Sequence, residues 1–313
     1  MRKFCPLKRR RQLRHGLKLL EIRGARNDKT LLIFAGVHGD EYAGSQAVVR
    51  LFERLDPRRI KGRILMVPNC NPSACKAAAQ CSTVDGKNLS GVFSGNPSGT
   101  LTERIACILS KLIRQSDFLI DLHSGGRDLD IAPLSGYLRC GGQMEALQHK
   151  ACIRFGLPIV FGQCPPPKET KVGPSLLPAW KLGVPAIYCE IAGANSCCEE
   201  HVVAYENGML AVAAMLGIIP KHTASKMPRP KRIIRENDLK KSCLNTRTAS
   251  QHEGIWIYRK RVLQRVQSGE IIGELRSLDG ECLDTVHAPS PGQIILLRHS
   301  ALVKKGDWLY CLA

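Results

Sequence analysis

The sequence lacks any apolar run that approaches the roughly 20 residues needed for a membrane-spanning helix. Its basic N-terminus also lacks the apolar stretch of a secretory signal. Aromatic residues make up only 5% of the chain, whereas proteins that bind single-stranded nucleic acid interleave aromatic and basic side chains. These absences argue against insertion into a membrane and against nucleic acid as a partner.

Several chemical motifs are absent as well. The 14 cysteines include no C-x-x-C pair, and most lie in apolar contexts, as Cys107 and Cys189 do. We therefore expect reduced, mostly buried cysteines in a cytoplasmic protein. No G-x-S-x-G surrounds Ser124, and the Gly-rich segment 95–99 lacks a phosphate-loop lysine. A serine nucleophile elbow and a nucleotide site are both disfavoured.

Acidic residues are scarce relative to basic ones, since 27 Asp and Glu face 46 Lys and Arg, for a formal charge of +19. Residues 1–23 hold nine basic residues and one acidic residue, and residues 221–313 hold 17 and nine, so each segment carries +8. Residues 24–220 carry only +3. The excess indicates either a solvated surface or an anionic partner at the ends of the chain.

Apolar runs and helical periodicity alternate along residues 24–220, which predicts an α/β domain. Strands are expected at 31–37, 62–68, 117–122 and 186–191, and helices at 41–55, 102–115, 142–155 and 202–219, with a short apolar segment at 157–162. Such strands favour a mixed, largely parallel sheet flanked by helices. Residues 69–100, rich in Gly, Asn, Ser and Pro, are expected to form a long irregular segment.

The ends of the chain differ from this pattern. Residues 1–23 are set apart as a basic N-terminal segment, and residues 221–239, with two prolines, as a basic linker. Short β-like pieces separated by Gly and Pro then predict a small all-β domain over 240–313. We expect that domain to be structural or to shape the entrance of a site.

Polar residues follow three of the buried strands. His38 and Glu41 come just after 31–37, His123 directly follows 117–122, and Glu190 lies near the end of 186–191. The carboxyl ends of parallel strands share one edge of a sheet, where ligands usually bind. We therefore expect these side chains to lie close together.

This set of residues has the composition of a catalytic zinc centre. Such a centre needs three ligands from His and carboxylate groups and leaves a position for water. His38, Glu41 and His123 meet that need, which leaves Glu190 as general base and Asp121 to orient His123. The alternative is that each is an ordinary polar residue, because H-x-x-E and a lone His after a strand both occur by chance.

Four motifs carry a resemblance to a known family. AGVHGDEYAG, DGKNLSGVFSG, DLHSGG and CEIAG, in this order, resemble the succinylglutamate desuccinylase/aspartoacylase family of the zinc carboxypeptidase-like (M14) group. The C-terminal APSPGQIILLRHSALVKKGDWLY is similar to the family's tail, and GTLTERIA and DLHSGGRDLD look like the N-acetyl-diaminobutyrate deacetylase branch. The resemblance implies a zinc-carboxypeptidase-like fold with one Zn²⁺ on His38, Glu41 and His123. It also implies that Glu190 is base and proton shuttle in the hydrolysis of an N-acyl amide bond.

The chain departs from the family at positions that contact the substrate. The family usually reads Asn-Leu-Asn-Arg where this chain has Asn88, Leu89, Ser90 and Gly91, and an arginine that polarises the carbonyl is matched by Gln80. Ser-Gly cannot supply the bidentate carboxylate binding of an arginine. Either the substrate lacks the usual carboxylate, or the carboxylate of the substrate binds to another cation. Arg127 is the nearest such cation in sequence.

We expect a zinc-dependent deacylase that hydrolyses a small N-acylated amino acid or amine, with Glu190, Gln80 and Arg127 as catalytic residues. Asn88, Ser90 and Gly91 are expected to contact the substrate. One alternative is a catalytically weak zinc-binding protein that has an anionic partner, and another is a carboxypeptidase. A homo-oligomer is left open.

Overall fold

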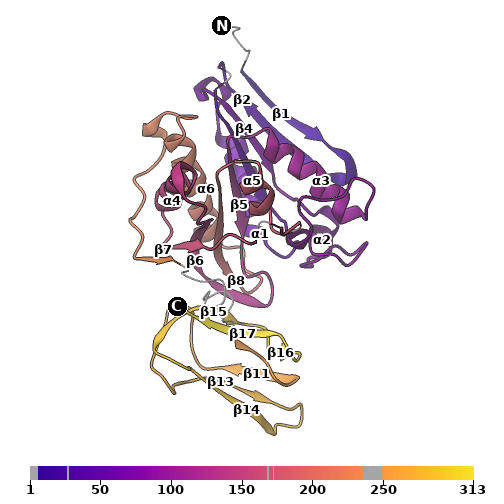
Figure 1. Ribbon diagram of the computed structural model, residues 1–313, viewed down its shortest axis with the longest axis vertical. Coiled ribbons are helices and arrows are strands. Elements are labelled where there is room, and N and C mark those ends of the chain that lie inside the picture. The colour runs from indigo at the N-terminus through magenta and orange to yellow at the C-terminus, as the bar shows by residue number, and fades with distance from the viewer. Residues whose placement is uncertain (1–5, 27, 168, 172, 236–247) are drawn as a thin grey trace.

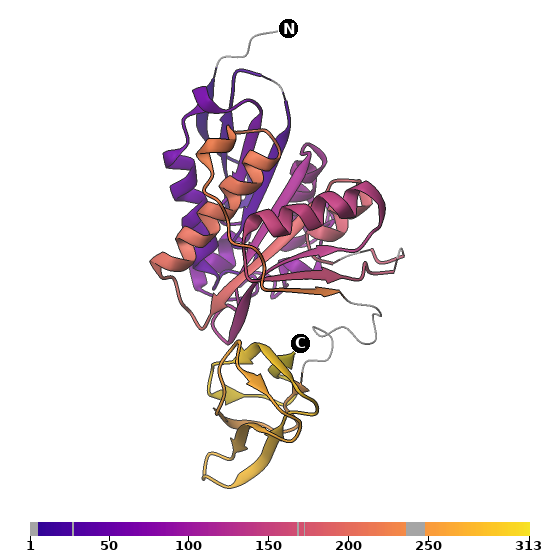
Figure 2. The ribbon, with the colours of Figure 1, turned by 90° about the vertical axis from the view of Figure 1, so that its left-hand side faces the viewer.

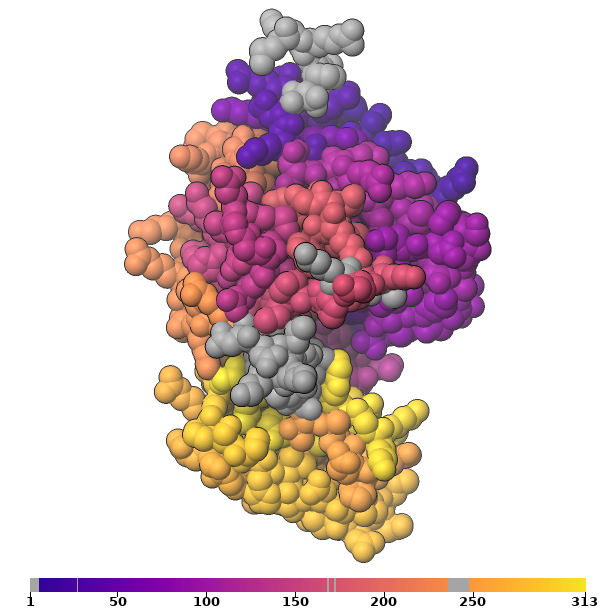
Figure 3. Space-filling model, viewed as in Figure 1, coloured from indigo at the N-terminus to yellow at the C-terminus, as the bar shows by residue number. Residues whose placement is uncertain are grey.

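The computed structural model describes residues 6–26, 28–167, 169–171, 173–235 and 248–313. It is an elongated molecule with an α/β body and a β-rich C-terminal region at one end (Figures 1 and 3). The last residues of the predicted linker at 221–239 and the predicted start of the β domain at 240 lie outside the described residues. Among the described residues, no helix has the length and apolar character needed to cross a bilayer.

The strands and helices are as follows. The strands are β1 (Leu7–Gln12), β2 (Lys18–Arg23), β3 (Thr30–Ala35), β4 (Arg63–Val67), β5 (Phe118–His123), β6 (Leu129–Leu138), β7 (Ile159–Gln163), β8 (Ala186–Gly193), β9 (Arg232–Arg235), β10 (Thr248–Ala249), β11 (Gly254–Tyr258), β12 (Arg265–Val266), β13 (Ile271–Arg276), β14 (Cys282–His287), β15 (Gly292–Arg298), β16 (Leu302–Val303) and β17 (Trp308–Leu312). The α-helices are α1 (Tyr42–Arg54), α2 (Pro72–Ala77), α3 (Leu101–Arg114), α4 (Gly142–Phe155), α5 (Leu176–Lys181) and α6 (Glu199–Met215).

One large mixed sheet flanked by helices forms the centre of the body, which confirms the predicted α/β fold. The sheet is not largely parallel, because antiparallel pairs outnumber parallel ones along it. Its strands run in the order β1-β2-β4-β3-β5-β8-β6-β15-β17-β10. The central run β4-β3-β5-β8 is parallel, and its neighbours β2 and β6 join it antiparallel. The parallel pairing therefore lies in the part of the sheet that carries the predicted site residues.

Helices cover both faces of this sheet (Figures 1 and 2). Along β3, Leu31 and Ile33 contribute to a core that includes residues of α1, α4 and α6, whereas Leu32 and Phe34 contribute to a second core with α3 and α5. All four side chains are fully buried. A strand buried on both faces must be apolar throughout, which explains the continuous run in the sequence.

Three parts of the large sheet were not predicted. β1 and β2 lie within residues 1–23, which were predicted to be a separate basic segment. Because β1 pairs with β2 and β2 pairs with β4, this segment is part of the large sheet. β9 lies in the predicted linker and pairs with β7. β6 contains Pro133, a residue that argues against a central strand. It fits because the β6–β8 register shifts between Ile131 and Leu134.

The predicted irregular segment 69–100 also holds regular structure. It contains the short helix α2, whose N-cap Asn71 accepts a hydrogen bond from the Ala74 N–H. It ends at Thr100, the N-cap of α3, whose backbone N–H donates to the Glu103 carboxylate at 2.7 Å. The segment is thus fixed at both ends, beside the carboxyl edge of the parallel strands.

The C-terminal β region continues the large sheet. β15 pairs with β6 of the body, so that Leu296 lies opposite Ile131 and Arg298 opposite Leu129. A separate four-stranded sheet, β14-β13-β11-β16, packs with β15 and β17 through a small apolar core. Backbone hydrogen bonds therefore join this region directly to the body.

Candidate metal centre

A tight turn after β3 carries the first two predicted ligands. Gly36 has a φ of +63°, a conformation that glycine adopts without strain. At Gly39, a Cβ atom would lie 2.0 Å from the carbonyl carbon of Ala74, so only glycine allows this turn to pack against α2. The two glycines bring His38 and Glu41 to the edge of the sheet where β5 ends in His123.

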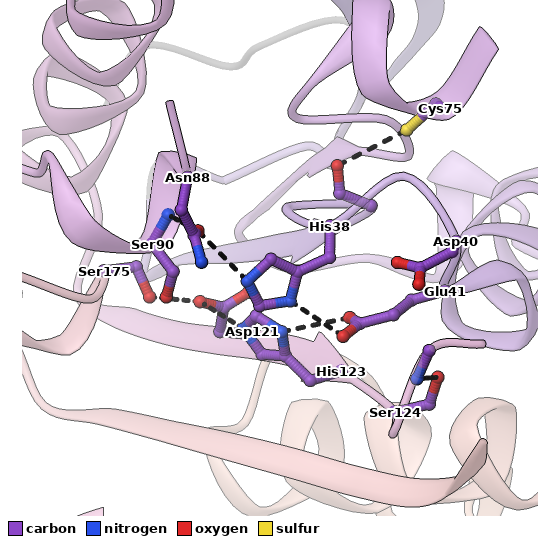
Figure 4. Close-up of polar contacts among 12 residues, drawn as sticks. His38, Asp40, Glu41, Cys75, Asn88, Ser90, Asp121, His123, Ser124 and Ser175 are labelled. Atoms are coloured by element: carbon purple, nitrogen blue, oxygen red, sulfur yellow. Dashed lines mark hydrogen bonds and ion pairs between the residues drawn. The ribbon is translucent and has the colours of Figure 1, made fainter. Parts of the chain in front are cut away.

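The three predicted ligands meet around the Glu41 carboxylate (Figure 4). Its Oε1 lies 2.8 Å from His38 Nδ1 and its Oε2 lies 3.1 Å from His123 Nδ1. One ligand atom from each residue can be chosen so that all lie within 4.8 Å of one another. Two imidazoles and a carboxylate form a donor set that a divalent metal ion binds in catalytic centres.

The other nitrogen of each imidazole is held by an oxygen atom. His38 Nε2 lies 3.2 Å from Asn88 Oδ1, and His123 Nε2 lies 3.2 Å from Asp121 Oδ2. Asp121 Oδ2 in turn accepts a hydrogen bond from the Ser175 hydroxyl. Oxygen partners of this kind orient metal-binding histidines and leave the opposite nitrogen to bind the metal. The arrangement therefore fits a metal bound through both Nδ1 atoms.

The charges at the centre favour a cation. Burial opposes ionisation of Glu41, but His38 and His123 outweigh burial and lower the pKa of the Glu41 carboxyl to about 2. Burial also disfavours a charged His123, yet Asp121 and Glu41 raise its pKa well above the usual value. The carboxyl groups of Glu41 and Asp121 thus flank a buried imidazole, an acidic setting that favours a bound cation.

Glu190 lies beside this group on the next strand. It is the residue of β8 that pairs with His123 of β5. Its side chain lines a cavity of about 660 Å³ that also contains His38 and Glu41. A carboxylate that shares a cavity with two of the three candidate ligands, and whose strand position pairs with the third, is well placed to exchange protons with a group bound there.

The remaining predicted residues divide into two groups. Gln80, Ser90 and Arg127 line the same cavity, whereas Gly91 is exposed and lies outside its lining. Asn88 also lines the cavity, but its Oδ1 faces His38 and the Ser90 N–H. Its position favours orienting His38, an assignment that differs from the substrate contact expected from the sequence.

Some residues of the site carried no signal in the sequence. Ser175 reaches Asp121 from a segment 54 residues away, and Asp40 Oδ2 accepts the backbone N–H of Arg127 at 2.9 Å. The C-terminal β region adds further residues to the cavity wall, namely Leu296, Arg298, Gly306, Asp307 and Trp308. They enter the site only because β15 pairs with β6, and β6 was not predicted.

Three comparisons with known proteins agree with this geometry. A family model described as the succinylglutamate desuccinylase/aspartoacylase catalytic domain matches residues 27–216. The N-alpha-acetyl-L-2,4-diaminobutyric acid deacetylase of Halomonas elongata is 45% identical over 107 residues, which cover 34% of this chain. The match spans only 31% of that relative's length.

Solved structures share the fold over almost the whole chain. A succinylglutamate desuccinylase from Silicibacter sp. TM1040 superposes with a TM-score of 0.84 at 24% identity, over 99% of this chain and 93% of that one. The product-bound ectoine utilization protein EutE (DoeB) from Ruegeria pomeroyi also gives 0.84 at 24% identity, over 98% and 93%. The likeness in fold includes the C-terminal β region.

Proposed function

Because the chain belongs to the succinylglutamate desuccinylase/aspartoacylase family, we propose that it is a zinc-dependent hydrolase of the amide bond in a small N-acylated amino acid or amine. The observation that carries the proposal is that His38, Glu41 and His123 meet at one point, while His38 and Glu41 share a cavity with Glu190. Two histidines and one glutamate match the ligand set of zinc hydrolases.

The residues divide the chemistry between them. A single Zn²⁺ held by His38, Glu41 and His123 would act as a Lewis acid and make a water more acidic at neutral pH. Glu190 accepts a proton from the attacking water, whose oxygen bonds to the acyl carbon. Glu190 then returns that proton to the amine nitrogen as the C–N bond breaks. The products are a carboxylic acid and an amine.

Two polar side chains are available for the carbonyl oxygen. Gln80 and Arg127 both line the cavity, and both are exposed at its surface. The backbone N–H of Arg127 donates a hydrogen bond to Asp40, and this contact fixes the position of the Arg127 backbone beside the cavity. Losing a donor to the developing oxyanion typically costs about 10²–10³ in turnover, so a neutral Gln80 alone would be a poor substitute for arginine.

The departures at Gln80, Ser90 and Gly91 favour one rival function. A protein that retained the metal ligands and lost efficient hydrolysis would bind zinc and show no turnover. A carboxypeptidase is disfavoured, because Ser90 and Gly91 offer no cation for a peptide's terminal carboxylate.

Amine release from a panel of N-acyl amino acids and N-acyl amines tests the proposal. The purified chain is assayed as isolated, after treatment with a chelator, and after Zn²⁺ is restored. We expect release from at least one member of the panel, loss with the chelator, and recovery with Zn²⁺. Zinc binding without release from any member would favour the inactive rival.

A further inference from the structure

The sheet beneath the cavity extends well beyond the catalytic residues. His123 on β5 pairs with Glu190 on β8. Two residues further along β8, Ala192 lies opposite Ile131 of β6, which in turn lies opposite Leu296 of β15. Adjacent strands lie about 4.8 Å apart, so β15 lies about 10 Å from β8 across the sheet. The cavity therefore has a floor that runs from the metal centre to the C-terminal region.

The side chains on the far part of this floor are apolar. Leu129 and Ile131 of β6 and Leu296 of β15 all line the cavity, and Trp308 of β17 lines it too. Leu129 and Ile131 are half-buried and Trp308 is 42% exposed, whereas Leu296 is only 2% exposed and supports the floor from within the core. Partly exposed apolar side chains in a cavity gain free energy when an apolar ligand covers them.

Two charged groups at this end, Arg298 and Asp307, are paired with each other, and Asp128 lies 3.7 Å from Arg127. Arg298 donates from Nε to the Trp308 carbonyl and from Nη1 to Ser300 Oγ, both at 2.8 Å, and its Nη2 lies 3.3 Å from Asp307. Only 8% of the Arg298 side chain is exposed. A cation with each nitrogen engaged in this way is poorly placed to bind a substrate carboxylate.

We propose that this far floor, made of Leu129, Ile131, Leu296 and Trp308, is a subsite for an uncharged apolar chain carried by the leaving amine of the substrate. The proposal rests on the hydrolase function above, in which Glu190 protonates the amine nitrogen. That nitrogen must lie within hydrogen-bonding reach of the Glu190 carboxylate, and β6 is the next strand of the sheet after β8. A chain of several carbons on the nitrogen then lies over β6 and β15.

Binding of n-alkylamines, the products of such a reaction, tests the subsite without relying on turnover. Calorimetric titration of the zinc-loaded protein with ethylamine, butylamine and hexylamine is expected to show a steady fall in Kd. Full burial of a methylene is worth up to about fourfold, so we expect roughly tenfold or more between ethylamine and hexylamine. Equal Kd values across the series would overturn the proposal.

Two variants place the effect at the proposed residues. Ile131→Glu is expected to abolish the dependence on chain length, because it puts a carboxylate on the floor. Leu129→Ala is a milder change and is expected to reduce the dependence of Kd on chain length. It keeps the proposal testable if Ile131→Glu fails to fold. Leu278→Glu, at a side chain that is 82% exposed, is the matched control and is expected to keep the wild-type series. An unchanged series in both Ile131→Glu and Leu129→Ala would place the subsite elsewhere and contradict the proposal.

Turnover of N-acetyl-n-alkylamines tests the hydrolase function and the apolar subsite separately. A kcat/KM that rises with chain length supports both the hydrolase function and the subsite. A kcat/KM that is independent of length overturns the subsite and leaves the hydrolase intact. Length-dependent binding of the amines without turnover of any N-acyl compound supports the apolar site and overturns the hydrolase. A preference for substrates with a terminal carboxylate or ammonium group on the amine also contradicts the subsite.

Discussion

His123 and Glu190 are paired residues on the neighbouring parallel strands β5 and β8. Because adjacent strands lie about 4.8 Å apart, the backbone itself sets the spacing between a predicted metal ligand and the predicted base. The third strand, β3, lies on the other side of β5 and leads into His38 and Glu41. The candidate site is thus built on the rigid parallel part of the sheet.

The Asp121 carboxylate is expected to tune metal binding through His123. Replacing it in Asp121→Ala removes the oxygen that holds His123 Nε2, so the imidazole loses its fixed orientation. We expect metal affinity to fall by about 10–100-fold, as is typical for such partners. Competition with a chromophoric chelator measures this change, and Asp279→Ala, at an exposed residue of the C-terminal region, is the control. An unchanged metal affinity in Asp121→Ala would show that Asp121 has no role in metal binding.

A methyl group at Gly39 is expected to disturb the turn that carries two ligands. The added Cβ would lie 2.0 Å from backbone atoms of Ala74, so α2 or the turn must move. Gly39→Ala should lower the free energy of unfolding by about 1–3 kcal/mol and weaken metal binding. At Gly91 an added Cβ meets no atom within 4 Å, so Gly91→Ala should unfold like the wild type. Equal thermal midpoints for the two variants would contradict this account.

The buried Glu21 predicts a dependence of stability on pH. Burial opposes its ionisation, but hydrogen bonds and charge from Arg9 and Arg63 outweigh burial and lower its pKa. A lowered pKa in the folded state stabilises the protein above the unfolded pKa, near 4.3, and this contribution is lost as pH falls through the folded value. Glu21→Gln should therefore cost about 2 kcal/mol at pH 7.

Urea unfolding of the wild type and Glu21→Gln at a series of pH values tests the sign of this effect. The difference between the two proteins should be constant near neutral pH and shrink as the wild-type carboxyl becomes protonated below pH ~4. A difference that grows on acidification would contradict the assigned direction of the pKa shift.

Asp85 is expected to hold the loop of Asn88 and Ser90 against α3. Its carboxylate accepts hydrogen bonds from the Thr102 N–H at 2.8 Å and from the Thr102 hydroxyl at 2.6 Å. Asp85→Ala leaves both donors without this partner, at a cost of about 1–3 kcal/mol in unfolding free energy. Limited proteolysis should also cut the loop around Asn88 faster than in the wild type. An unchanged cleavage rate would mean that other contacts hold the loop.

The sequence was sufficient to predict the central strands and the residues that meet at their ends. Continuous apolar runs before His38 and ending at His123 indicate strands buried on both faces, and parallel strands bring their ends to one edge. The grouping of His38, Glu41 and His123 was predicted in this way. Helical periodicity over 102–115 also predicted α3, which begins at Leu101 after the N-cap Thr100.

The parts that escaped prediction depend on contacts between distant segments. Because Pro133 argues against a central strand, β6 was not predicted. The sequence therefore suggested that the C-terminal domain shapes the entrance of a site but could not assign that role to Leu296 or Trp308. Ser175 meets Asp121 through a similar long-range contact. β1 was not predicted because its residues are mostly basic. Edge strands are often charged in this way and then lack the continuous apolar run that indicates a buried strand.

Measurement of turnover and zinc content together in Glu190→Gln tests the central claim most directly. Glutamine keeps the size of the side chain but cannot accept and return a proton. The account predicts one zinc per chain, as in the wild type, and a kcat on an N-acyl substrate lowered by at least about 100-fold. Full turnover by zinc-loaded Glu190→Gln would contradict the proposed role of Glu190 and, with it, the proposed mechanism of hydrolysis.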